Sequence, residues 1–84
     1  MEATIVIRKI SGEVVSVIIF PRDDPEERKQ DIAVSELALL ENYQIIEGMD
    51  VGDRFVAEIN NGAGPDYKVT KILRQDRSED IIVW

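Results

Sequence analysis

The chain has 84 residues, and its 17 Asp and Glu outnumber its 10 Lys and Arg, so its formal charge is −7 at pH 7. It contains no cysteine and no histidine, which excludes disulfides, thiolate chemistry, imidazole catalysis and most transition-metal sites. A net acidic chain is also a poor candidate for direct nucleic-acid binding, because phosphate contacts need a basic surface. The length suits one domain, with 44% hydrophobic and 32% charged residues as in ordinary soluble proteins.

Signals for a membrane or for export are not seen in the sequence. Apolar runs such as Val17–Phe20 are far shorter than the roughly 20 residues of a spanning helix, and Met1–Thr4 carries no basic residue of a signal peptide. We therefore expect a cytoplasmic protein without membrane contact. The adjacent carboxylates lack the spacing of a calcium loop, so we expect no metal and no cofactor.

The first half of the chain predicts a β-hairpin. Residues 3–10 and 14–20 are rich in β-branched side chains and flank a short turn that contains Gly12. Residues 14–20 are apolar at almost every position, which predicts a strand covered on both faces. Residues 21–31 hold no aliphatic side chain apart from prolines, which predicts a solvated excursion.

Residues 25–41 allow two interpretations. Asp24 and Pro25 could begin one long helix, but its apolar residues would then point nearly all round the helix axis. In the preferred alternative, 31–34 is a short strand and Ser35 caps a short helix from Glu36 to about Asn42. The hydroxyl oxygen of Ser35 would accept a hydrogen bond from a backbone N–H group at the start of this helix.

The second half predicts two further strands. Residues 54–60 alternate apolar and polar side chains, and 67–74 continue an alternating pattern after a turn at 60–65. Residues 1–84 form a single domain in this interpretation, with the sheet and helix in 1–75 and a polar, then apolar, tail in 76–84. The fold class is α+β, with a curved antiparallel sheet of about five strands and one short helix.

Charge is unevenly distributed along the chain. From Asp31 to Asp53 there are six acidic residues and no Lys or Arg, which indicates either a solvated surface or an acidic face for a basic partner. Lys68, Lys71, Arg74 and Arg77 recur at every third residue. On a regular strand they would divide between the two faces, so no basic stripe is expected.

The order of these features resembles the C-terminal domain of the bacterial transcript-cleavage factors GreA and GreB and of the related regulator Rnk. The resemblance lies in the turn and strand at 11–15, in 19–21 and the acidic loop that follows, in Ile32–Leu37, in Ile45–Asp53, and in 61–62 and 67–72. That domain is similar in fold to the FK506-binding proteins, so the resemblance implies an FKBP-like sheet around a short helix.

The chain departs from that family in three ways. Glu36 stands where the family has a corner proline that helps to contact RNA polymerase, and residues 41–44 look like an insertion. The predicted hairpin begins at residue 3, without the family's N-terminal coiled coil, which carries the acidic tip for RNA cleavage. The resemblance therefore implies a docking domain and not a cleavage factor.

The sequence predicts a non-enzymatic domain that binds a protein partner without direct nucleic-acid contact, and the resemblance implies that this partner is RNA polymerase, near its secondary channel. The alternative is a small acidic protein of mobile-element type that inhibits a nucleic-acid enzyme. The predicted partner-binding residues are Val34, Ser35, Glu36, Leu37, Glu41 and Glu47.

Overall fold

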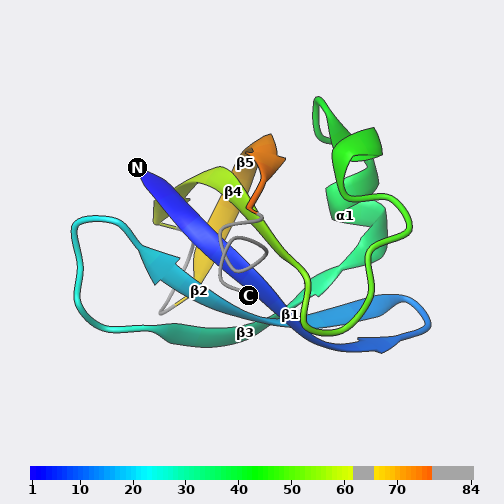
Figure 1. Ribbon diagram of the computed structural model, residues 1–84, viewed down its shortest axis with the longest axis horizontal. Coiled ribbons are helices and arrows are strands. Elements are labelled where there is room, and N and C mark those ends of the chain that lie inside the picture. Colours follow the sequence, from blue (N-terminus) through cyan, green and yellow to red (C-terminus); the bar gives the residue numbers. More distant parts are fainter. Residues whose placement is uncertain (62–65, 77–84) are drawn as a thin grey trace, which may run out of the picture.

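The structure of the chain is a computed structural model that describes residues 1–61 and 66–76. Five strands, one short α-helix and one 3₁₀ helix follow one another along these residues (Figure 1). In chain order they are β1 Glu2–Ser11, β2 Val14–Pro21, β3 Arg28–Ala33, α1 Val34–Ala38, η1 Tyr43–Ile45, β4 Arg54–Asn61 and β5 Tyr67–Gln75. The connection at 62–65 and residues 77–84 of the predicted 76–84 tail, among them Arg77 and Trp84, lie outside the described residues.

The strands form one antiparallel sheet in the order β3-β2-β1-β4-β5. The predicted hairpin is confirmed, because β1 pairs with β2 from Ala3 opposite Pro21 to Ser11 opposite Val14. β1 lies at the centre and also pairs with β4. The sheet curls as it crosses the molecule, and α1 stands at one end of it (Figure 1). An antiparallel sheet with a short helix confirms the α+β class.

The core lies on the inner, concave face of the sheet. Alternate residues of each strand point there, and the most completely buried are Ile5, Ile19, Phe55, Ile59 and Ile72. Leu37 of α1 and Ile46, just after η1, complete the same cluster. Burial of these apolar side chains supplies the main stabilisation, at about 25 cal/mol per Å² removed from water.

The prediction that residues 14–20 are covered on both faces is wrong. Val15, Val17 and Ile19 are buried on the inner face, but Ile18 is half-buried and Phe20 is 41% exposed on the outer face. The outward-facing apolar residues of β2 therefore lie on an outer surface of the sheet that no second layer covers among the described residues.

The α1 region corrects the predicted helix boundaries. β3 runs directly into the helix, so the N-cap is Ala33 and no side chain caps it. The N–H of Val34 instead donates to the carbonyl of Glu13 in the hairpin turn, at 2.8 Å, which satisfies one of the free helix-terminal N–H groups. Ser35 is therefore an exposed residue inside the helix and not its cap. The helix ends at Ala38, well before the expected Asn42.

The predicted solvated excursion at 21–31 is wrong at Pro21, which is the buried last residue of β2, and over its last four residues, which belong to β3. They are polar because β3 is an edge strand, paired only with β2 among the described strands. Lys29 and Asp31 are exposed, while Arg28 and Gln30 are half-buried. Hydrophobicity alone could not distinguish such an edge from a loop.

Two irregularities in β5 also correct the expectation that its basic residues divide between two faces. The register with β4 shifts between Val56 and Ala57 and again between Glu58 and Ile59. Each shift leaves one residue of β5 without a cross-strand partner, as in a β-bulge. Directly paired residues share a face, so Lys68, Lys71 and Arg74 all lie on the outer face, opposite Asn60, Glu58 and Val56.

Candidate partner-binding groove

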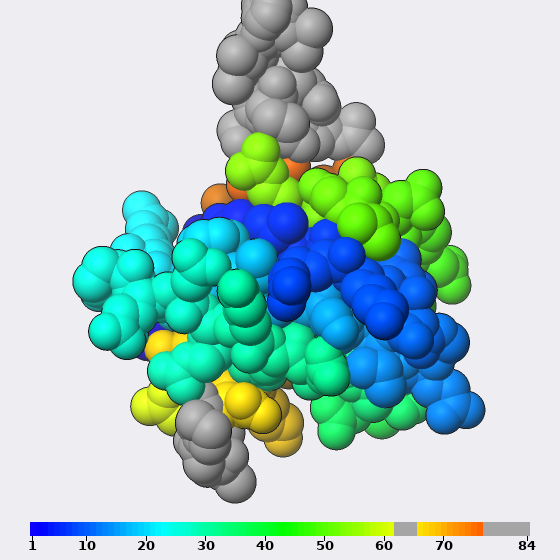
Figure 2. Space-filling view, turned by 90° about the horizontal axis from the view of Figure 1, so that it is seen from below, coloured from blue at the N-terminus to red at the C-terminus, as the bar shows by residue number. Residues whose placement is uncertain are grey.

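The two edge strands of the curled sheet meet at one point. The side-chain amide of Gln30 in β3 donates to the carbonyl of Tyr67 in β5 at 2.8 Å, and its oxygen accepts the N–H of Tyr67 at 2.9 Å. The guanidinium of Arg28 lies 5.3 Å from the centre of the Tyr67 ring, within cation–π range. Figure 2 shows the start of β5 beside β3. A glutamine side chain thus closes the sheet where the backbones do not pair.

Beyond this closure the two edges separate, and α1 lies beside the opening. The resulting groove has a volume of about 580 Å³. Its buried apolar lining comes from all three elements: Ile32 of β3, Leu37 of α1 and Val69 of β5. Leu39, just after the helix, is 86% exposed and stands with Leu40 at the same groove. We name this feature the α1 groove.

The segment after α1 is tied to β5 by side-chain amides. The Asn42 amide donates to the carbonyl of Ile72 at 3.1 Å, and the Gln75 amide donates to the carbonyl of Ile45 at 2.8 Å. Asn42 itself has a left-handed backbone, with φ of 68°, a conformation that asparagine tolerates better than most residues. These contacts fix the loop that carries Leu39 and Leu40 against the sheet.

The predicted site residues fall into three places. Glu36 and Leu37 line the α1 groove. Ser35 and Glu41 are exposed nearby in the chain, outside its lining, and Glu47 is exposed in the turn after η1. Val34 is absent from the groove lining; it packs against the core and, together with Leu37, lines a second apolar cavity of about 210 Å³. The six residues therefore do not form one surface.

Sequence reasoning missed most of the groove. Leu39 and Leu40 were assigned to a longer helix, although the apolar residues of 37–40 fit no single helix face. That misfit was the available signal for an exposed leucine. Gln30 and Tyr67 gave no signal, because their contact depends on the curl of the sheet across 37 residues of sequence.

The polar residues around the α1 groove make it acidic. Among the described residues, its lining includes Asp31, Glu36 and Asp66 against one cation, Lys68. All four are exposed, so they can interact with a ligand at the rim while the apolar lining receives an uncharged side chain. Within residues 1–61 and 66–76 no cluster of acidic side chains has an arrangement that could hold a metal ion.

Comparison of the chain with protein-family models, with curated protein sequences and with solved structures found no match. In the part of the chain that the structure describes, no helix has the length and apolar character needed to cross a membrane.

Proposed function

We propose that the chain is a non-enzymatic protein-binding module that receives an extended segment of a partner protein in the α1 groove. The observation that carries this proposal is the groove itself, where two strand edges and a short helix enclose apolar residues beside an 86% exposed leucine. Large exposed apolar residues beside a lined groove are typical of interaction sites.

The chemistry of the groove defines the partner segment. An apolar side chain would contact Leu37 and Val69, and Lys or Arg on either side would meet the acidic rim. An extended backbone suits the site because β3 and β5 each have one neighbour among the strands of residues 1–61 and 66–76. Strand edges of this kind add extended peptides through main-chain hydrogen bonds.

A display selection of short random peptides against the protein tests this proposal. We expect enriched peptides with an apolar anchor flanked by Lys or Arg. Leu39→Ser should weaken their binding strongly, whereas Val51→Ser, which alters another exposed apolar residue outside the groove lining, should leave it unchanged. Equal binding by both variants would contradict the proposal.

RNA polymerase is the specific partner that we propose from the resemblance to the GreA, GreB and Rnk C-terminal domain. The antiparallel sheet with one short helix is compatible with the FKBP-like class that the resemblance implies. The segment 32–37, part of which lines the α1 groove, resembles the family's polymerase-contacting corner in sequence. A pull-down with purified core polymerase, in competition with GreA or GreB, tests this version. Absence of binding at moderate salt would refute it while leaving the peptide selection to decide the broader proposal.

The acidic-inhibitor alternative has its own structural support. Glu36, Glu41, Glu47, Asp50 and Asp53 are all exposed on the segment between β3 and β4. If this charge binds a basic enzyme, the complex should dissociate by about 0.3 M salt because exposed charges are then strongly screened. Replacing Glu36, Glu41 and Glu47 with glutamine should abolish such binding and weaken peptide binding in the groove only partly.

A further inference from the structure

The outer face of the sheet carries much of the positive charge of this acidic protein. The irregular register of β5 places Lys68, Lys71 and Arg74 in one row along the strand. Arg54 of β4 faces the same side, since it pairs with half-buried Val6 of β1. Of the acidic residues, Glu2 and Glu58 lie on this face as a cross-strand pair, with Glu58 opposite Lys71, whereas those of 36–53 belong to α1, η1 and their loops. The −7 charge of the chain is thus not the charge of this face.

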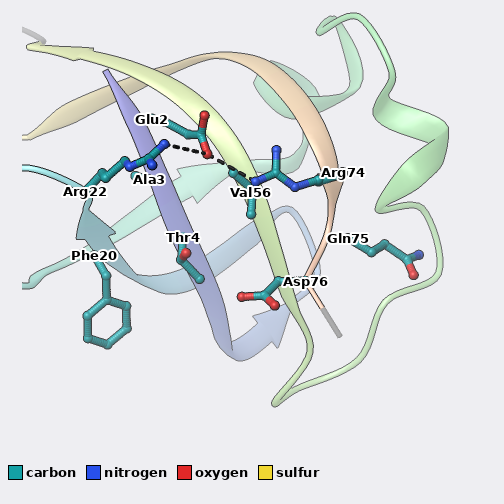
Figure 3. Close-up of a pocket in the computed structure, with 9 residues that line it drawn as sticks. All are labelled: Glu2, Ala3, Thr4, Phe20, Arg22, Val56, Arg74, Gln75 and Asp76. Atoms are coloured by element: carbon teal, nitrogen blue, oxygen red, sulfur yellow. Dashed lines mark hydrogen bonds and ion pairs between the residues drawn. The ribbon is translucent and has the colours of Figure 1, made fainter. Parts of the chain in front are cut away.

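A hollow of about 280 Å³ lies at the end of this basic row (Figure 3). Thr4 and Val56 line it from the two central strands, and Phe20 lines it from the end of β2. Val56 is only 7% exposed, although its neighbours Phe55 and Ala57 point to the core face. The 41% exposed Phe20 therefore presents an aromatic ring on the outer face, which also carries buried Val56 and half-buried Val6 and Ile18.

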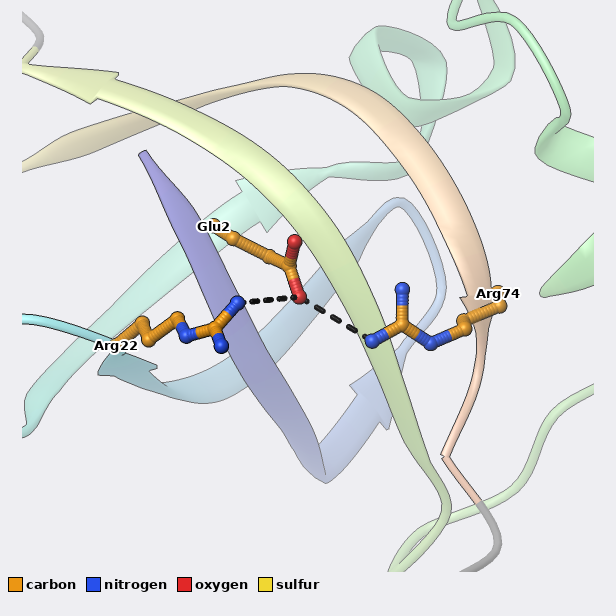
Figure 4. Close-up of polar contacts among 3 residues, drawn as sticks. All are labelled: Glu2, Arg22 and Arg74. Atoms are coloured by element: carbon orange, nitrogen blue, oxygen red, sulfur yellow. Dashed lines mark hydrogen bonds and ion pairs between the residues drawn. The ribbon is translucent and has the colours of Figure 1, made fainter.

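Two arginines bracket the hollow and share one carboxylate (Figure 4). Glu2 Oε1 lies 3.2 Å from Nη2 of Arg74 and 3.8 Å from Nη1 of Arg22. The side chains of Arg74 and Arg22 are 61% and 72% exposed. Glu2 and Asp76, which also lines the hollow, balance the two guanidiniums in formal charge, so the positive charge of the face comes from the row beyond the hollow. Both arginine side chains are exposed enough to reach a ligand above the sheet.

This combination points to a polyanion with planar, apolar groups. A row of cations can follow a phosphate backbone, while an exposed aromatic ring on a sheet stacks an unpaired base. An acidic polypeptide would satisfy the cations but would leave the aromatic ring and the hollow unused. Duplex DNA would not expose its base faces to Phe20.

We propose that the outer face of the sheet binds single-stranded nucleic acid, with a base against Phe20 in the hollow and the phosphates along Arg22, Arg74, Lys71 and Lys68. The net charge of the chain predicts no nucleic-acid contact, because it sums the acidic segment 36–53 and the basic row on the outer face into one number. The site is separate from the α1 groove, apart from Lys68, which lies at the edge of both.

Fluorescence anisotropy with a labelled oligothymidylate of about eight nucleotides tests this proposal, a length within the range bound by single-strand sites of this size. Phe20→Ala should weaken binding by about fivefold or more, since stacking on one base contributes at least about 1 kcal/mol. Lys71→Gln should reduce the slope of log K against log salt by about 0.7. Glu2→Gln should tighten binding, because it removes the carboxylate that competes with phosphate.

Arg8→Gln is the matched control, because it removes the same charge from an exposed residue at an irregular position of β1, outside the hollow. It should leave the affinity and the salt slope nearly unchanged. Circular dichroism should show that each variant keeps the wild-type fold. No binding at about 20 mM salt, or an unchanged affinity in Phe20→Ala, would overturn the proposal. Tighter binding of polyglutamate than of the oligonucleotide would also overturn it and assign the face to acidic proteins.

Discussion

Replacing Gln30 with alanine should open the contact between the two edges of the sheet. The change removes both hydrogen bonds to the Tyr67 backbone, at 2.8 and 2.9 Å. Each such bond contributes about 0.5–1.5 kcal/mol net, so the pair contributes about 1–3 kcal/mol. After the change, water can reach the backbone N–H and carbonyl of Tyr67, and no glutamine side chain has to be ordered on folding. Both effects reduce the cost, so the expected loss of unfolding free energy is about 1–2 kcal/mol.

Urea unfolding followed by circular dichroism measures this loss directly, and thermal unfolding should show a fall of about 4–8 °C per kcal/mol for a domain of this size. Gln44→Ala provides the control, because Gln44 is exposed in η1 and its removal should change stability by less than about 0.5 kcal/mol. If Gln30→Ala is no more destabilising than Gln44→Ala, the glutamine does not hold the edges together and the reasoning is refuted.

Other substitutions test the placement of α1 by the same unfolding measurements. Leu37→Ala should lower the free energy of unfolding by about 2–5 kcal/mol, because Leu37 is 4% exposed in the core. Leu39→Ala should lower it by less than about 0.5 kcal/mol. Similar losses for both variants would show that α1 presents a different face to the core. Ser35→Ala should leave the free energy of unfolding nearly unchanged, because no side chain caps the helix. A loss of about 1 kcal/mol would show that the Ser35 side chain does cap it. Asn42→Ala should cost about 1–2 kcal/mol through the lost bond to Ile72 and the left-handed backbone, and wild-type stability would contradict that contact.

The strands could be predicted from sequence where local pattern and burial agree. β1, β2, β4 and β5 follow from β-branched residues and alternation, and the Gly12 turn gives the first hairpin. Gly12 has φ of 59°, a backbone that glycine adopts without strain. The predictions for the outer face of β2 and for the polar edge strand β3 were wrong for a common reason. Both depend on which strands and layers lie beside these strands, and the local sequence does not encode that.

The α1 groove and the basic row could not be predicted without the pairing of residues between strands. Ser35 carried a plausible capping signal, but the hairpin carbonyl of Glu13 supplies an acceptor from a distant part of the chain. Lys68, Lys71 and Arg74 have a spacing that a regular strand would divide between faces. Two local shifts in pairing with β4 reverse that result, and neither shift has a marker such as glycine in β5.

Backbone amide chemical-shift mapping with a peptide from the display selection tests the proposed binding site most directly. If the α1 groove receives the partner, titration should shift the amides of Leu37–Leu40 and of Tyr67–Val69, with little change at Thr4 or Val51. Shifts confined to the outer face around Thr4 and Phe20, with the groove amides unmoved, would contradict the assignment of the α1 groove as the partner-binding site.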